Sequence, residues 1–330
     1  MPSIDSLWKI LEIRLPQENE FTPESMSSLL SNFVQMSHLS FFNRILGKKP
    51  TIISLEIVLQ KGQIHFYVAI PKDSNNSDTE FFRAQILAQY PSAITKDSQD
   101  YLSSFLQGGM SEGSENRKNL FTSQLSLSRP YTYPLKTNRD FRDTDPLTSV
   151  LSPLVRSNNA EDFSLYQILL SPPPKNWQSS IISVIQNGII VDKEKGFRQA
   201  HPDKQVFETK IQYPGLLTQI NLLSNNSTLL NSLSSSFGIF TSPRGNFIKT
   251  SSPNFFNKNK LQKSIFARSF FSGLSNQILN VEELAAMWHF PTALTKLPNI
   301  AWGKNLFSDP PENLPVATGL DEAAREKITF

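Results

Sequence analysis

The apolar pattern of the first hundred residues constrains the fold of this chain more than any other feature. Apolar residues alternate along 8–15, as they do in a strand that buries one face. Residues 23–34 then carry apolar side chains at helical spacing, behind a capping residue, Thr22, and a first-turn proline, Pro23. The pattern therefore predicts a strand followed by an amphipathic helix.

A hairpin, a second helix and a short strand complete this unit. Residues 53–59 and 64–70 both alternate, and Lys61-Gly62 between them supplies a two-residue turn. A helix over 77–90 and an edge strand near 93–96 are expected to follow. This β-α-β-β-α-β order, with right-handed crossovers, places both helices on one face of a four-stranded antiparallel sheet, which is the ferredoxin-like arrangement.

The rest of the chain predicts a second, less regular domain. Alternating or apolar runs predict strands at 120–127, 162–170, 207–213 and 246–249. Helical spacing predicts helices at 145–156, 174–186, 228–237 and 258–271. Charged residues at 192–204 are expected to form a loop.

A length of 330 residues suits about two domains. Gly, Ser and charged residues mark 107–119 as a flexible linker between a first domain, 1–106, and a second, 120–272. Residues 273–330 are expected to form a docking helix and a proline-rich tether. The predicted fold class is α+β, with two split β-α-β (ferredoxin-like) domains with antiparallel sheets, followed by a C-terminal helix and an extended proline-rich tail.

Composition excludes several kinds of site. The chain has no cysteine, which removes disulfides, thiolate zinc sites and cysteine nucleophiles. Its histidines fall in no zinc-binding pattern, so no metal and no cofactor is expected. No run of 18 apolar residues and no signal peptide is visible, which predicts a cytoplasmic protein. The net charge is only +3, so a nucleic-acid-binding surface would have to be a local patch of basic residues.

Two short sequence matches to catalytic motifs lack the flanking elements or residues that those motifs need. Gly109–Gly113 matches the G-x-S-x-G pattern around Ser111, but no core strand precedes it and no helix follows it. Gly47-Lys48 and Gly303-Lys304 lack the second glycine and the Ser/Thr of a P-loop, so no ATP site is expected. We therefore expect no catalytic residue, and a hydrolase that uses Ser111 is the least favoured hypothesis.

A nucleic-acid-binding protein is the alternative hypothesis. Residues 61–68 begin like the RNA-contacting third strand of an RRM, a module with the same element order. The positions that stack bases in that module hold Gln63 and His65 here, not aromatic residues. Lys258, Lys260, Lys263 and Arg268 make the helix at 258–271 basic, although a solvated cationic side is the more common reason for such a pattern.

The segment from Leu279 to Pro315 carries a resemblance to a known family. Asn280 and Glu283 predict a capping box, Leu284 and Trp288 lie on the apolar face, and Pro291 ends the helix. The run LNVEELAAMWHFP, followed by PPENLP, resembles the segment before the motor domain in conjugation and type IV secretion ATPases of the HerA/FtsK-like class (TraC/TraG-like transfer ATPases). LEIRLPQENEFTPESM and ISLEIVLQKGQIHFYVAIP look like the non-catalytic N-terminal region of the same family.

That resemblance implies a function through contacts. It implies an accessory or docking region of an ATPase that moves DNA or protein through a type IV secretion channel, as a homo-oligomer at the inner face of the cytoplasmic membrane. The expected partners are further copies of the chain, secretion-channel proteins and, through the motor, DNA. No small-molecule substrate is expected. The residues expected to make contacts are Leu284, Trp288, His289, Phe290, Pro291, Pro310 and Pro311.

Overall fold

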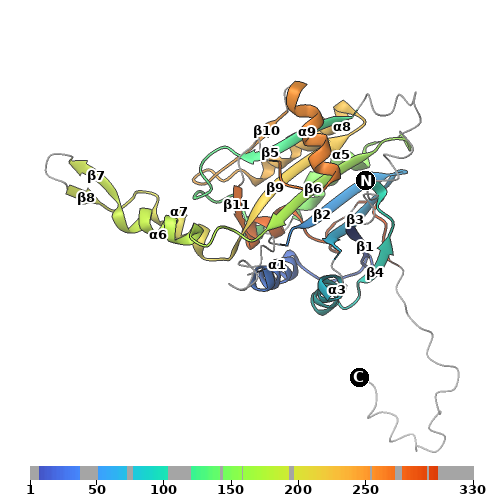
Figure 1. The fold of residues 1–330 in the computed structure, drawn as a ribbon, viewed down its shortest axis with the longest axis horizontal. Helices are drawn as coiled ribbons and strands as arrows, with labels where there is room; N and C mark the ends of the chain where they lie inside the picture. The colour runs from blue at the N-terminus through green and yellow to red at the C-terminus, as the bar shows by residue number, and fades with distance from the viewer. Residues whose placement is uncertain are drawn as a thin grey trace, which may run out of the picture.

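A computed structural model describes residues 7–37, 51–72, 77–102, 120–141, 144–157, 159–192, 197–252, 255–271, 277–295 and 297–303. Its centre is an open sheet of nine strands, packed with helices, from which one arm extends (Figure 1). Every pairing between its strands is antiparallel. The α+β class predicted from the sequence is therefore confirmed.

The first part of the chain forms the elements that its apolar pattern predicts. Their order is β1 (Trp8–Arg14), α1 (Pro23–Ser37), β2 (Ile53–Gln60), β3 (Gln63–Pro71), α3 (Ser77–Gln89) and β4 (Ile94–Ser98). Lys61 and Gly62 join β2 to β3 with positive φ values of 50° and 73°. Positive φ at both central residues is the requirement of a type I′ turn, whose twist suits a two-residue hairpin.

The second part is longer and less regular. Its order is β5 (Phe121–Leu127), α5 (Pro146–Val155), β6 (Ser164–Ser171), α6 (Trp177–Asn187), β7 (Ile189–Asp192), β8 (Phe197–Gln199), α7 (Lys204–Ile211), β9 (Gly215–Ser224), α8 (Ser227–Ser236), β10 (Ile248–Ser251), α9 (Phe255–Phe266), β11 (Gln277–Asn280) and α10 (Val281–Met287). Two short 3₁₀ turns, η3 (Asn138–Asp140) and η4 (Phe237–Phe240), lie beside the helices.

The two parts share one sheet where the sequence predicts two. The strand order is β10-β5-β9-β6-β2-β3-β1-β4, with β11 beside β9. In the first part β3 lies between β1 and β2, and in the second β9 lies between β5 and β6, so each part contains a split β-α-β unit. Strands β2 and β6 pair along their length and join the two parts. The boundaries proposed from composition stay a prediction.

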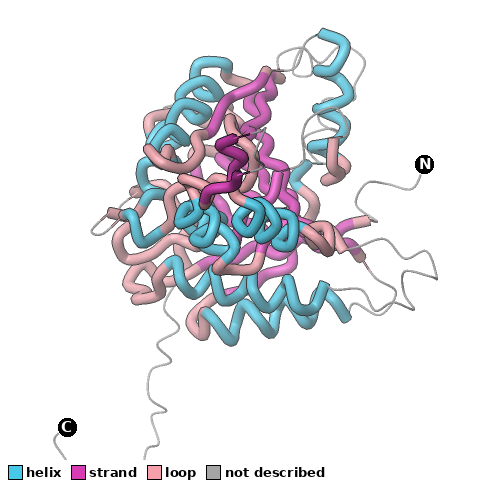
Figure 2. Tube along the Cα trace, turned by 90° about the vertical axis from the view of Figure 1, so that its left-hand side faces the viewer, coloured by secondary structure: helices cyan, strands magenta, loops and turns pink. Residues whose placement is uncertain are grey.

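Each face of the sheet has its own hydrophobic cover. Helices α1, α3, α5, α8 and α10 share one cluster of buried side chains with one face. The second face is covered by α9 and by residues near Tyr101, which form a separate cluster with Trp8, Tyr67 and Leu223. Figure 2 shows most helices on one side of the strands and a single helix on the other.

Two sequence predictions in the second part are wrong, and one central strand is missing from the predicted elements. Residues 207–213, predicted as a strand, belong largely to helix α7, where Phe207 and Lys210 point inward. The predicted loop at 192–204 includes the end of β7, strand β8 and the start of α7. Strand β9, which pairs with three other strands, was not predicted because both of its faces are buried and its apolar residues do not alternate.

A buried arginine fixes α9 to the second face. Arg268, fully buried just after α9, donates to Glu56 of β2 at 2.8 and 3.1 Å and to Asp100 at 2.7 and 2.9 Å. Tyr101 and Gln167 also donate to Glu56. Burial alone would raise the pKa of Glu56, but the adjacent guanidinium lowers it overall. This network connects α9, two central strands and the segment after β4.

Candidate functional site: a protruding arm

The arm is an insertion between β6 and β9, two neighbouring strands of the sheet. Helices α6 and α7 form its base, and the two-stranded ribbon β7-β8 forms its outer part, pointing away from the sheet (Figure 1). The ribbon pairs with no strand of the main sheet. A two-stranded ribbon is marginally stable alone, so its stability depends on what holds it at the base.

Apolar packing holds the base of the arm against the sheet. Trp177 of α6 and Phe207 of α7 are buried with Ile278 of β11 in a cluster separate from the two main ones. Gly215, the first residue of β9, leaves room for the indole, because a β-carbon there would lie 2.7 Å from Trp177 Cζ2. The arm therefore begins as a rigid extension of the sheet.

A buried ion pair adds a second attachment. Lys210 of α7 and Glu283 of α10 are fully buried and form a salt bridge, and Lys210 Nζ also donates to the Ile278 carbonyl at 2.9 Å. Burial lowers the pKa of Lys210, and the Glu283 carboxylate only partly restores it. Glu283 also accepts from the backbone of Leu135 and Asn280. Helix α10 thus holds the arm through polar contacts as well.

The turn between α6 and the ribbon depends on a glycine. Gly188 has φ of 60° and donates its backbone N–H to the Val184 carbonyl, which ends α6. A β-carbon at this position would lie 2.1 Å from the Gln199 carbonyl oxygen. Only glycine therefore lets β8 approach the end of α6 this closely.

Helix α6 and the ribbon of the arm both expose large apolar side chains. Phe197 is 64% exposed, Val191 56% and Ile190 51%, and Ile182, Val184 and Ile189 are also exposed. Such residues gathered on one projecting element mark an interaction surface more often than a free one. We call these six residues the arm surface, and they are the strongest candidate for a functional contact in the described part of the chain.

The contact residues predicted from the sequence lie elsewhere. Leu284, Trp288, His289 and Phe290 are at most 1% exposed, and Pro291 is also buried. Trp288 and Phe290 pack edge-on against each other, within the cluster that covers the first face of the sheet. Their placement leaves them no free surface for a partner. Pro310 and Pro311 lie outside the described residues.

Helix α10 is instead a central support of the helical layer. The predicted capping box is confirmed, since Asn280 accepts from the Glu283 N–H at 2.9 Å and Glu283 accepts from the Asn280 N–H at 2.7 Å. The Met287 carbonyl accepts from Tyr166 Oη of β6 at 3.1 Å. The Pro291 carbonyl accepts from Asn19 at 2.9 Å. The helix predicted to dock a motor is thus bound within its own chain.

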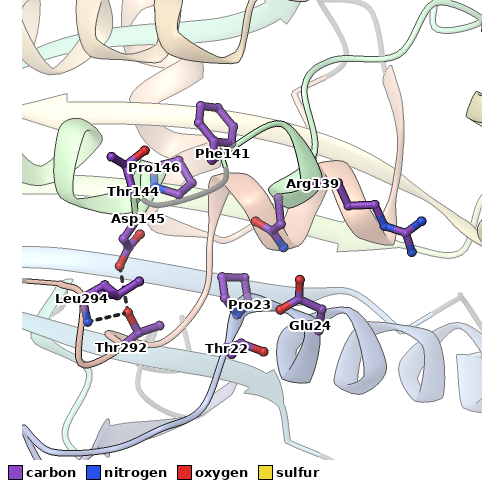
Figure 3. Close-up of a pocket in the computed structure, with 11 residues that line it drawn as sticks. Thr22, Pro23, Glu24, Arg139, Phe141, Thr144, Asp145, Pro146, Thr292 and Leu294 are labelled. Atoms are coloured by element: carbon purple, nitrogen blue, oxygen red, sulfur yellow. Dashed lines mark hydrogen bonds between the residues drawn. The ribbon is translucent and has the colours of Figure 1, made fainter.

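His289 and Asp145 form a buried pair without catalytic geometry. His289 Nδ1 lies 2.7 Å from the Ala285 carbonyl oxygen and Nε2 lies 3.0 Å from Asp145 Oδ1. Each ring nitrogen therefore faces an oxygen atom of its own chain, and neither is directed at open space. Thr292 and Thr295 donate to the other oxygen of Asp145, as Figure 3 shows for Thr292. No hydroxyl faces a free histidine nitrogen, so the group ties α5 to α10 and does not form a nucleophile.

Acid is expected to weaken this pair. Burial would raise the pKa of Asp145, but His289 outweighs it and lowers the pKa to about 2. Stability from this carboxylate is therefore present above its ordinary pKa and lost between about pH 4 and pH 2, an effect of about 2 kcal/mol. Urea unfolding of wild type and Asp145→Asn should differ at pH 6 and converge toward pH 2. A difference that does not change with pH would contradict the assignment.

The sheet face proposed for nucleic acid is largely closed. Tyr67 is buried and stacks on Tyr101 at 4.9 Å, so it offers no face to a base. His65 Nδ1 lies 2.8 Å from the carboxylate of Glu12. The buried Glu12 carboxylate also accepts from Arg14, so the polar groups of this face pair with one another. Helix α9 buries Leu261 and Ile265 and exposes Lys260 and Lys263, the pattern of a covering helix.

Other predicted features find no further support. Ser111 and the Gly47-Lys48 pair lie outside the described residues. Within the described ranges, no group of three or more His, Asp or Glu residues is placed to hold a metal ion. In that same part of the chain, no helix is both long and apolar enough to cross a membrane.

The fold defines a mixed α+β protein built on one antiparallel sheet, from which an inserted arm extends. The chain belongs to the family described as Domain of unknown function (DUF8128), whose model matches residues 3–211. The match runs from before β1 to the last residue of α7 and so includes the arm. No curated protein matches the chain.

Proposed function

We propose that this protein is a non-catalytic docking component of a type IV secretion or conjugative transfer ATPase, and that the arm surface makes its contacts. The observation that carries the proposal is the exposure of Ile190, Val191 and Phe197 on a ribbon with a rigid base. The sequence resemblance of Leu279–Pro315 to transfer ATPases supplies the context. An accessory region needs a projecting contact surface and no nucleotide site of its own.

The partner proposed for the arm surface is a second copy of the chain. The ribbon has exposed side chains on both faces and two unpaired strand edges within the described residues. Two such ribbons related by a two-fold axis bring the same apolar residues together, which is the usual geometry of homodimers. Pairing of the ribbons would also stabilise an element that is marginal alone.

Self-association should therefore depend on the arm surface. We expect wild type to sediment as a dimer or larger species at micromolar concentration, and Ile190→Asp/Phe197→Asp to sediment as a monomer. Leu7→Asp is the matched control, since Leu7 is 57% exposed outside the arm. Circular dichroism should show that all three proteins are folded. If wild type is a monomer, or if Leu7→Asp loses self-association to the same extent, the arm is excluded as the contact between copies.

The connection to a transfer motor has its own test. DNA on either side of the coding sequence should encode, in frame or in a neighbouring gene, a domain with the G-x-x-x-x-G-K-[ST] motif. A locus without such a motor would contradict the transfer role and leave the self-association result unaffected. Strong, salt-dependent binding of single-stranded RNA or DNA by the isolated chain would favour the alternative, a nucleic-acid-binding protein.

A further inference from the structure

A cavity lies between the first turns of α1 and α5, well apart from the arm. Its volume is about 320 Å³, which is within the usual range of sites for small molecules. It is lined by Thr22, Pro23 and Glu24 at the start of α1, by Thr144, Asp145 and Pro146 at the start of α5, and by Asn138, Arg139, Phe141, Thr292 and Leu294. Figure 3 shows Phe141 and Pro23 on opposite sides of this space.

One buried polar side chain in this lining lacks a hydrogen-bond partner within the described residues. Asn138 is 7% exposed, and neither its amide nitrogen nor its amide oxygen forms a hydrogen bond in the described part of the chain. Leaving a buried amide unpaired destabilises the folded state, because the amide loses its hydrogen bonds to water. In contrast, Asp145 and Thr292 already bond each other and their neighbours. Asn138 is therefore the group in the cavity wall that still requires a donor and an acceptor.

We propose that this cavity binds an adenine nucleoside through Asn138. A carboxamide presents one donor and one acceptor side by side, and the N6 and N7 positions of adenine present the complementary pair. The flat apolar surfaces of Pro23, Phe141 and Pro146 suit the faces of a base. Both amide atoms are buried, so the proposal requires the cavity wall to move outward when the base binds.

Glu24 is the residue proposed to bind the ribose of the nucleoside. Glu24 is exposed at the cavity edge and forms no hydrogen bond or salt bridge with the described residues. A carboxylate accepts hydrogen bonds from ribose hydroxyls, as acidic residues do in dinucleotide-binding folds. Arg139 lies near Glu282 and over the ring of Tyr213, at the edge of the cavity, and the carboxyl groups of Glu24 and Asp145 make the lining acidic. A neutral nucleoside suits this interior better than a triphosphate.

Calorimetric titration of the full chain with adenosine and with inosine tests the proposal. Inosine carries an acceptor at the position of the adenine amino group, so it cannot complete the pair with Asn138. Adenosine is expected to bind at least tenfold more tightly than inosine. Glu24→Gln should weaken adenosine binding and leave the preference for adenosine over inosine intact. Equal binding of the two nucleosides, or no binding of adenosine at millimolar concentration, would overturn the proposal.

An isosteric variant separates binding from folding. Asn138→Leu should weaken adenosine binding about ten- to a hundredfold, because it removes both hydrogen bonds to the base. Without ligand, the same variant should raise the melting temperature, because an apolar side chain replaces an unpaired amide. The matched control is Asn187→Leu in the arm, which should leave binding unchanged. A lower melting temperature in Asn138→Leu would show that water or another group already pairs the amide, and the proposal would fail.

Discussion

Arg268→Met is expected to destabilise the protein by about 3–5 kcal/mol, the cost of breaking a buried ion pair by removing one partner. The substitution keeps a long side chain but leaves Glu56 and Asp100 as buried carboxylates without their cation. Urea unfolding followed by tryptophan fluorescence suits the measurement, because the Arg268 guanidinium lies 5.7 Å from the ring centroid of Trp8. The midpoint should fall sharply with little change in slope.

The pH dependence of the free energy of unfolding tests whether the buried carboxylates cause the loss of stability in Arg268→Met. In wild type the pKa of Glu56 is lowered, so its contribution to stability is present above the ordinary pKa and decreases in acid. In the variant, burial without a cation raises the pKa of the same carboxyl, so acid stabilises the folded state by protonating it. The stability difference between the two proteins should therefore narrow from pH 7 toward pH 5.

Two further variants serve as controls. Arg268→Lys keeps the charge but lacks the planar fork that donates to both carboxylates, so its stability should fall between wild type and Arg268→Met. Lys9→Met removes a salt bridge to Asp97, whose carboxylate is 53% exposed, and should change stability by less than about 1 kcal/mol. If Arg268→Met were as stable as Lys9→Met, the buried network would not hold α9 to the sheet.

Local patterns explain which parts of this fold are predictable from sequence. Strand β1, the β2-β3 hairpin and the capping box of α10 depend on neighbours within a few positions, and all three are confirmed. The strand prediction at 207–213 is wrong because Phe207, Ile211 and Tyr213 all fall on odd positions, although Phe207 and Ile211 also have helical spacing. The predicted strand would have exposed Lys210 on its polar face. In the structure Lys210 is buried, which is unusual for a lysine.

Long-range contacts explain what the sequence could not reveal. Arg268 meets partners 212 and 168 positions away, and no local pattern marks it as a buried residue. The run Ile189-Ile190-Val191 resembles a core strand, and only the fold shows that it projects from the sheet. Conversely, the sequence around Trp288 predicts a helix but does not show what that helix packs against. The prediction of a docking surface there comes from the family resemblance. The arm surface and the cavity at Asn138 both required the three-dimensional arrangement.

Lys210→Met is expected to cost about 3–5 kcal/mol and to loosen the base of the arm, because it leaves the buried Glu283 without its cation. The double variant Lys210→Met/Glu283→Gln should recover part of this loss. Glutamine at position 283 still accepts from the Asn280 N–H in a capping box, but it carries no charge. A recovery of about 1 kcal/mol or more is expected, and the single variant Glu283→Gln completes the cycle that measures the coupling of the pair.

The same helix supplies the control for this prediction. Lys204 and Glu208 of α7 form an exposed pair at 3.7 Å, and Lys204→Met should change stability by less than about 1 kcal/mol. Hydrogen exchange should show faster opening of α6 and α7 in Lys210→Met than in Lys204→Met, because only the former loses its attachment to α10. Equal exchange in the two variants would contradict a role for the buried pair in holding the arm. Since the proposed contact between copies needs a rigidly held ribbon, Lys210→Met should also weaken self-association, with Ile190 and Phe197 unchanged.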